Sequence, residues 1–278
     1  MGFFKLRVVF LVLIMAGAAN FHKIFAQGIP ETEIFNGING DFQQIKGVQQ
    51  DELGNLWIAS DSHIEKFNSH KSIFFNNFKG LPKGTGEINT IFIDSRDKIW
   101  IGTNTGLIKY DALKDHFLQI AIDSETPKIE QIIEDENGVL WIGATNGIWQ
   151  YQDEKLMLLA RFPEEKSVNQ LLSVGNEIVF GTSSGLFVLT KKSGFYKKIK
   201  FPKDLNIQSL AYSGDFYLIG TLSEGLFRTY PDFTSLEKVY TLPYSSNGVA
   251  ITGISHDRSG NFYIATKGDG LYGLDKNL

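Results

Sequence analysis

Apolar and polar residues alternate in short segments that recur along almost the whole chain. Six segments share an apolar–aromatic–apolar pattern that ends in a small residue, and a second alternating segment begins a few residues later. The small residues are Ala59, Gly102, Gly143, Gly181, Gly220 and Ala265. A two-residue period with β-branched and aromatic side chains predicts strands, and a repeat of about 41 residues is the length of a four-stranded antiparallel blade. The pattern predicts an all-β propeller of six blades.

A constant apolar residue precedes the small residue in every repeat, and we expect it to open the first strand of each blade. These residues are Ile45, Ile88, Ile129, Val168, Ile207 and Ile251. Links rich in Asp and Gly separate the first and second strands, and fourth strands are expected at 72–75, 116–120 and 195–199. Five of the seven prolines fall between a fourth strand and the next first strand, where they end an outer strand without breaking a ladder.

Closure of the ring is open to two interpretations. The sixth repeat ends after its third strand, whereas the segment 33–35 reads as an outer strand without a blade of its own. Pairing this N-terminal strand with the last blade would close a ring of six and leave no open edge. In the alternative, the six blades belong to a larger, truncated array.

The N-terminus has the features of an export signal. Lys5 and Arg7 precede the apolar run 8–19, which is shorter than the roughly 20 residues that a membrane span needs. We expect cleavage after Ala26, which leaves residues 27–278 as the propeller, with an uncleaved anchor as the alternative. The expected location is periplasmic or otherwise exported. Association with the inner membrane would require a retained signal or a missing C-terminal region.

Charge and cysteine content exclude several classes of partner and site. The formal net charge is −4, and it becomes about −7 when the signal is removed, because three basic residues and no acidic residue leave with it. Nucleic acid and anionic membranes require clustered basic residues, so neither is expected as a partner. The absence of cysteine excludes disulfides, thiolate metal sites, a cysteine nucleophile and a lipoprotein anchor.

The second and third repeats contain the segments DSRDKIWIGTNTGLIKYD (94–111) and DENGVLWIGATNGIWQYQ (135–152). This pattern resembles the two-component regulator propeller repeat, from which the first repeat departs at His63 in a glycine position. The resemblance implies a periplasmic input domain of a sensor histidine kinase or hybrid two-component sensor, in many cases a sensor of glycans. The family usually forms seven-bladed rings followed by kinase modules. We find no such module here, so the resemblance implies sensing without kinase activity, and a dimer only in a signalling parent.

The residue that follows the constant apolar residue of the first strand is polar in every repeat. By rotational symmetry, these residues should form a ring at the mouth of the central channel. That face also carries the connections between strands four and one and between strands two and three. The ring residues are Lys46, Asn89, Glu130, Asn169, Gln208 and Thr252. Their mixed donors and acceptors would suit sugar hydroxyls or a peptide backbone. The alternative is that a wet channel is lined with polar residues regardless of function.

Loops of the same face add four further candidates for ligand binding. Asn104 and Asn146 lie in connections between second and third strands, together with His63, and Tyr244 in the loop 242–252 could stack on a sugar ring. Each has a structural alternative, namely turn formation for the polar residues and packing on the rim for Tyr244.

Catalytic machinery is not evident in the sequence. We find no nucleophile elbow, phosphate-binding loop, zinc spacing or calcium loop, and one histidine on the loop face is a weak basis for a metal or a general base. We therefore predict no catalytic residue, metal or cofactor. The leading hypothesis is recognition of an oligosaccharide or a protein partner on the loop face. The alternatives are a metal-assisted lyase or hydrolase of the streptogramin-lyase type, and a purely structural interaction domain.

Overall fold

The computed structural model describes residues 44–68, 70–121, 127–163, 166–239, 249–257 and 259–276, all of them in strands, turns and loops. The part of the chain so described contains no helix that could cross a membrane. The first two sheets comprise β1 (Ile45–Gln50), β2 (Leu56–Ser60), β3 (Ile64–Phe67), β4 (Ser72–Phe75), β5 (Ile88–Ile93), β6 (Ile99–Thr103), β7 (Gly106–Asp111) and β8 (His116–Gln119). The third and fourth comprise β9 (Ile129–Glu134), β10 (Leu140–Ala144), β11 (Gly147–Gln152), β12 (Lys155–Arg161), β13 (Val168–Val174), β14 (Glu177–Thr182), β15 (Gly185–Thr190) and β16 (Tyr196–Lys198). The last two comprise β17 (Ile207–Tyr212), β18 (Tyr217–Thr221), β19 (Leu226–Thr229), β20 (Glu237–Lys238), β21 (Ile251–His256), β22 (Phe262–Thr266) and β23 (Leu271–Leu274).

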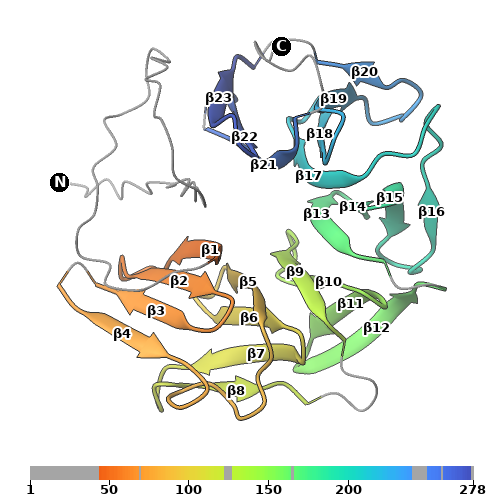
Figure 1. Cartoon of the computed structure of the whole chain (residues 1–278). Helices are drawn as coiled ribbons and strands as arrows, with labels where there is room; N and C mark the ends of the chain where they lie inside the picture. Colours follow the sequence, from red (N-terminus) through yellow and green to blue (C-terminus); the bar gives the residue numbers. More distant parts are fainter. Residues whose placement is uncertain are drawn as a thin grey trace, which may run out of the picture.

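The sheets follow one another around a common axis, so the molecule is a β-propeller, and the predicted fold is confirmed (Figure 1). Within each sheet the strands pair antiparallel in chain order, and the first strand of each sheet packs against the first strand of the next from β1 to β21. The sixth sheet has three strands among the described residues. The closing strand expected at 33–35 and the signal expected at 1–26 both lie outside the described residues, so closure and cleavage stay predictions.

Two constant positions of the repeat, the glycine of a second strand and the apolar residue that opens the next sheet, meet across four boundaries between sheets. A Cβ atom added at Gly181 in β14 would stand 2.3 Å from Cγ2 of Ile207, the first residue of the next sheet. The same addition at Gly143 in β10 would stand 2.6 Å from Cγ1 of Val168. Ile207 and Val168 are fully buried. The small residue of the second strand therefore leaves space for the apolar residue that opens the following blade, because well-packed interiors have no room for an extra methyl group.

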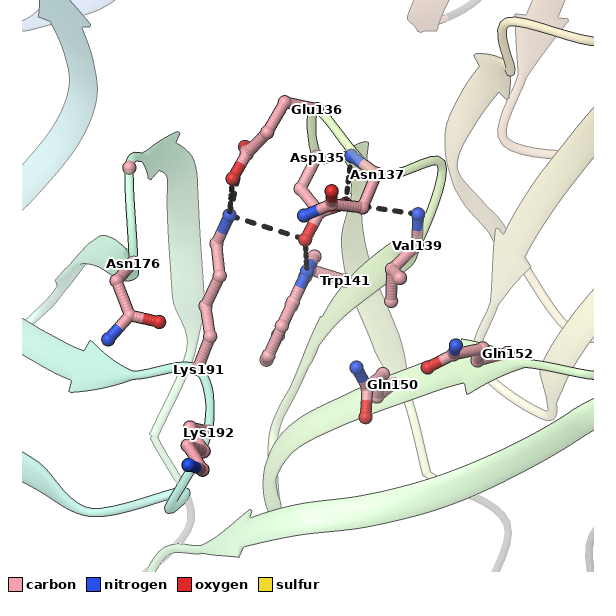
Figure 2. Close-up of a pocket in the computed structure, with 11 residues that line it drawn as sticks. Asp135, Glu136, Asn137, Val139, Trp141, Gln150, Gln152, Asn176, Lys191 and Lys192 are labelled. Carbon is pink, nitrogen blue, oxygen red and sulfur yellow. Dashed lines mark hydrogen bonds and ion pairs between the residues drawn. The ribbon is translucent and has the colours of Figure 1, made fainter.

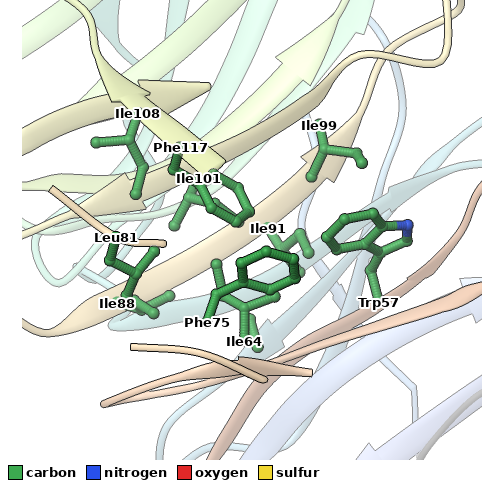
Figure 3. Packing of buried hydrophobic residues seen from close by; sticks show 11 residues of the cluster. Trp57, Ile64, Phe75, Leu81, Ile88, Ile91, Ile99, Ile101, Ile108 and Phe117 are labelled. Carbon is green, nitrogen blue, oxygen red and sulfur yellow. The ribbon is translucent and has the colours of Figure 1, made fainter. Parts of the chain in front are cut away.

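Tryptophan side chains on the second strands fill the space between neighbouring sheets. Trp57 of β2 is fully buried and packs against Phe75 of its own sheet and Phe117 of the next (Figure 3). The indole Nε1 of Trp57 donates to the carboxylate of Asp51, in the turn between β1 and β2, at 2.9 Å. The pairs Trp100–Asp94 and Trp141–Asp135 repeat this bond at 2.8 and 2.9 Å. Each aspartate thus fixes both its turn and a core indole.

Candidate functional site

The six predicted ring residues occupy one register in the structure, the second position of the first strand of each sheet. Each also lies at a β-bulge. The residues immediately before and after it pair with the second strand, whereas the ring residue itself has no pairing partner there. The ring residues are Lys46, Asn89, Glu130, Asn169, Gln208 and Thr252. A bulge leaves one residue outside the ladder and redirects its side chain. The sequence predicts the common register, whereas no residue type in it marks the bulges.

Two ring residues take part in the contact between sheets. Nδ2 of Asn89 donates to the carbonyl oxygen of Ile129 at 2.8 Å, and Nδ2 of Asn169 donates to the carbonyl oxygen of Ile207 at 2.6 Å. Asn89 also donates to Oδ1 of Asn104 at 3.0 Å, so two predicted candidates lie together. These amides satisfy main-chain acceptors of the following sheet, which gives Asn89 and Asn169 a structural role and leaves only part of their hydrogen-bonding capacity for a ligand.

The other ring residues have local partners. Glu130 forms an ion pair with Lys128 at 3.0 Å, and its side chain is 16% exposed. Nε2 of Gln208 donates to Oδ1 of Asn206 at 2.7 Å. These contacts use one carboxylate oxygen of Glu130 and the amide nitrogen of Gln208, so the second oxygen of Glu130 and Oε1 of Gln208 can still accept from a ligand. Lys46 donates to Gln44 at 3.2 Å, and Thr252 donates to the carbonyl of Ala265 at 3.3 Å.

The loop candidates have structural contacts of their own. Oδ1 of Asn146 accepts a hydrogen bond from Nε1 of Trp149 at 2.9 Å, whereas its buried Nδ2 has no partner in the described structure. Tyr244 lies outside the described residues. Asn146 therefore has a buried donor available on this face.

The hydroxyl of Ser60 and the imidazole of His63 lie in contact, and their geometry is that of a turn. Oγ of Ser60 lies 2.9 Å from Nδ1 of His63 and 3.0 Å from its carbonyl oxygen, and Ser60 is fully buried. Thr103 and Thr221 make the same bond to a turn carbonyl in other sheets, both at 2.8 Å. The hydroxyl closes the turn in each case. Over the described ranges, no group of three or more His, Cys, Asp or Glu side chains could hold a metal ion.

The region 83–105 matches the family model of the two-component regulator propeller. It includes β5 and β6 of the second sheet. The second repeat is therefore a two-component regulator propeller repeat. This repeat is one of the two in which the sequence pattern is clearest, and the resemblance found in the sequence is confirmed.

Solved structures share the propeller fold that contains this repeat. Two extracellular domains from Bacteroides thetaiotaomicron, each described as part of a hybrid two-component system, are 21% and 19% identical, with TM-scores of 0.67 and 0.71. The alignments cover 86% and 85% of this chain but 32% and 34% of theirs, so the chain spans about a third of their length. Virginiamycin B lyase from Staphylococcus aureus is 15% identical, with a TM-score of 0.64 and coverage of 84% and 85%. No curated protein matches the sequence. At these identities the similarity shows the fold alone.

Proposed function

We propose that the chain is an exported recognition propeller, the input region of a two-component sensing system, which binds an oligosaccharide at the ring of bulged polar residues. The observation that carries this proposal is the placement of a polar side chain at the same bulge in all six sheets. Bulges are frequent beside binding sites, where they redirect side chains. The two-component regulator propeller repeat at 83–105 supports the sensing role.

Glu130 and Gln208 are the ring residues with the most hydrogen-bonding capacity left for a ligand. Both retain an acceptor oxygen, and both are partly exposed. Sugar hydroxyls donate and accept, so they match carboxylate and amide oxygens. Asn89 and Asn169 are less suitable for a test because removing them would also break bonds between sheets.

The test is binding of the purified chain to a glycan array, followed by calorimetry on any oligosaccharide that binds. We expect the double variant Glu130→Ala/Gln208→Ala to weaken binding about tenfold or more, since each lost hydrogen bond contributes about 0.5–1.5 kcal/mol. The matched control is Glu52→Ala/Gln49→Ala, which removes one carboxylate and one amide at the other end of the first sheet. Binding that is equally strong in both double variants would show that the ring is not the site, and retention of a partner protein instead would favour an interaction domain.

The lyase hypothesis has its own support in the shared fold with virginiamycin B lyase. Its strongest candidate residue is His63, whose imidazole contacts Ser60 in the turn after β2. A chelator-sensitive turnover that His63→Ala abolishes would favour this hypothesis over recognition. Turnover that survives either treatment would count against it.

A further inference from the structure

A polar pocket of about 400 Å³ lies between the third and fourth sheets, at the end of the molecule opposite the ring (Figure 2). Its walls are the turn between β9 and β10, the outer part of β11, and two turns of the fourth sheet, β13–β14 and β15–β16. First-to-second and third-to-fourth connections share one end of a blade of antiparallel strands, and the ring belongs to the other end. The pocket is therefore separate from the site proposed above.

One wall of the pocket is fixed by an ion-paired lysine. Nζ of Lys191 lies 3.2 Å from Oδ2 of Asp135 and 3.0 Å from Oε2 of Glu136, and the lysine side chain is only 9% exposed. Asp135 also accepts from Nε1 of Trp141 at 2.9 Å. Figure 2 shows Lys191 reaching from the fourth sheet to both carboxylates of the third. This wall is built before any ligand arrives, which lowers the entropic cost of binding.

The remaining lining consists largely of amide side chains whose hydrogen-bonding groups have no protein partner among the described residues. Those of Asn137, Gln150, Gln152 and Asn176 make no hydrogen bond within the described structure, and the ammonium of Lys192 forms no ion pair there. Each amide offers a donor and an acceptor, the same pair that a peptide group needs. The charges of the pocket balance, because two carboxylates face two lysines. The lining thus favours an uncharged ligand rich in donors and acceptors.

The spacing of the two glutamines favours an extended peptide among such uncharged ligands. Gln150 and Gln152 lie two residues apart on β11 and both line the pocket, so they are separated by about 6.7 Å. An extended peptide presents peptide groups of one orientation at the same interval. The aromatic residue of the lining, Trp141, is 1% exposed, so the lining itself offers no ring for stacking on a sugar. The turn that carries Lys191 also carries Phe195, whose side chain is 68% exposed and could anchor an apolar residue of the partner.

We infer that this pocket binds an extended, uncharged segment of a partner protein, held by the amides of Gln150 and Gln152. This second recognition surface lies on the end of the propeller that carries the first-to-second and third-to-fourth turns, and its binding is independent of the function of the ring.

The test uses the purified chain on an array of uncharged octapeptides, acetylated at the N-terminus and amidated at the C-terminus, with a glycan array in parallel. We expect peptides to bind, and the double variant Gln150→Ala/Gln152→Ala to bind them about tenfold or more weakly, because each glutamine supplies up to two hydrogen bonds. Gln49→Ala, which removes a partly exposed amide from β1, is the control and should bind as the unaltered chain does. Thermal unfolding checks that all variants are folded.

Three results would overturn the proposal. One is that no peptide binds at about millimolar concentration, the weakest range worth considering for recognition. Another is equal peptide binding by the double variant and the unaltered chain. The last is a glycan whose binding falls in the double variant, since the pocket would then be a sugar site.

Discussion

At the scale of single residues, the aspartate of the first turn is the most informative position. Asp51 accepts hydrogen bonds from the amides of Leu53 and Asn55 at 3.1 and 2.8 Å and from the indole of Trp57 at 2.9 Å. Ser213 in the fifth sheet accepts only from amides of its own turn, and no tryptophan follows it. The aspartate therefore couples the turn to the core in the sheets that have a tryptophan.

Replacement of Asp51 by alanine is expected to destabilise the protein by about 2–4 kcal/mol. The change leaves the buried indole N–H of Trp57 and the amide of Asn55 without an acceptor, and each unsatisfied buried group costs about 1–3 kcal/mol. Urea unfolding measures the difference. Asp215→Ala is the control, because Asp215 lies in the corresponding turn of the fifth sheet with its carboxylate exposed, and it should stay within about 0.5 kcal/mol. Equal effects of the two variants would refute the role of the indole bond.

The equivalent bond between Asp135 and Trp141 should make the stability of the protein depend on pH. Burial raises the pKa of its carboxyl, but the hydrogen bonds from Trp141, Val139, Asn137 and Lys191 outweigh burial, and the pKa lies below the ordinary 3.8. A carboxyl with a lowered pKa stabilises the fold above its unfolded pKa, and this contribution is lost as the pH falls toward the folded pKa. The unfolding free energies of the unaltered chain and of Asp135→Asn should therefore converge between about pH 5 and pH 3. A difference that is constant over this range would contradict the assignment.

At the scale of strands and sheets, the contact between a small residue and the next sheet sets the register of neighbouring blades. Gly181→Ala should destabilise the protein by about 1–3 kcal/mol, because the added methyl would lie 2.3 Å from the side chain of Ile207. The double variant Gly181→Ala/Ile207→Ala should lose less unfolding free energy than the sum of the losses in the two single variants. A double-mutant cycle by urea unfolding measures this coupling. Strict additivity would mean that the two positions do not share the space.

The sequence was sufficient for the strands because each one repeats the same alternation, and six copies reinforce the assignment. It placed Ile45 and its counterparts at the start of the first strands and Ala59 and its counterparts in the second strands, and both placements are confirmed. It could not show that Asn89 donates to Ile129, since this bond depends on how one sheet is placed against the next. The pocket of Gln150 and Lys191 was missed for the same reason, because its residues come from two sheets and neither of its two glutamines recurs at the same position in the other repeats.

At the scale of the whole molecule, each sheet packs against its neighbours in sequence. The first-strand contacts run from β1 to β5, β9, β13, β17 and β21, and Lys191 adds an ion-paired link between the third and fourth sheets. Repeat structures of this kind approximate a chain of units joined by interfaces between nearest neighbours. Damage at one interface should therefore remain local.

Hydrogen exchange measured by mass spectrometry would test this locality. In Gly181→Ala, which alters the interface between the fourth and fifth sheets, we expect faster exchange in β13–β20 and little change in β1–β8. Ile73→Ala, in the outer strand β4, serves as the reciprocal variant, with the change expected in the first two sheets. Uniform acceleration over all six sheets in both variants would show that the molecule opens as a single cooperative unit.

The uneven distribution of indole rings has an optical consequence. All four tryptophans belong to the first three sheets. Trp57, Trp100 and Trp141 lie on the second strands, and Trp149 lies on the third strand β11. The second strands of the last three sheets have Val179, Leu218 and Tyr263 in place of the tryptophan. Intrinsic fluorescence excited at the indole band would report unfolding of the N-terminal half and would change little when the C-terminal half unfolds. Circular dichroism of the peptide backbone reports on both halves. A difference between the unfolding transitions measured by the two signals would therefore show which half unfolds first.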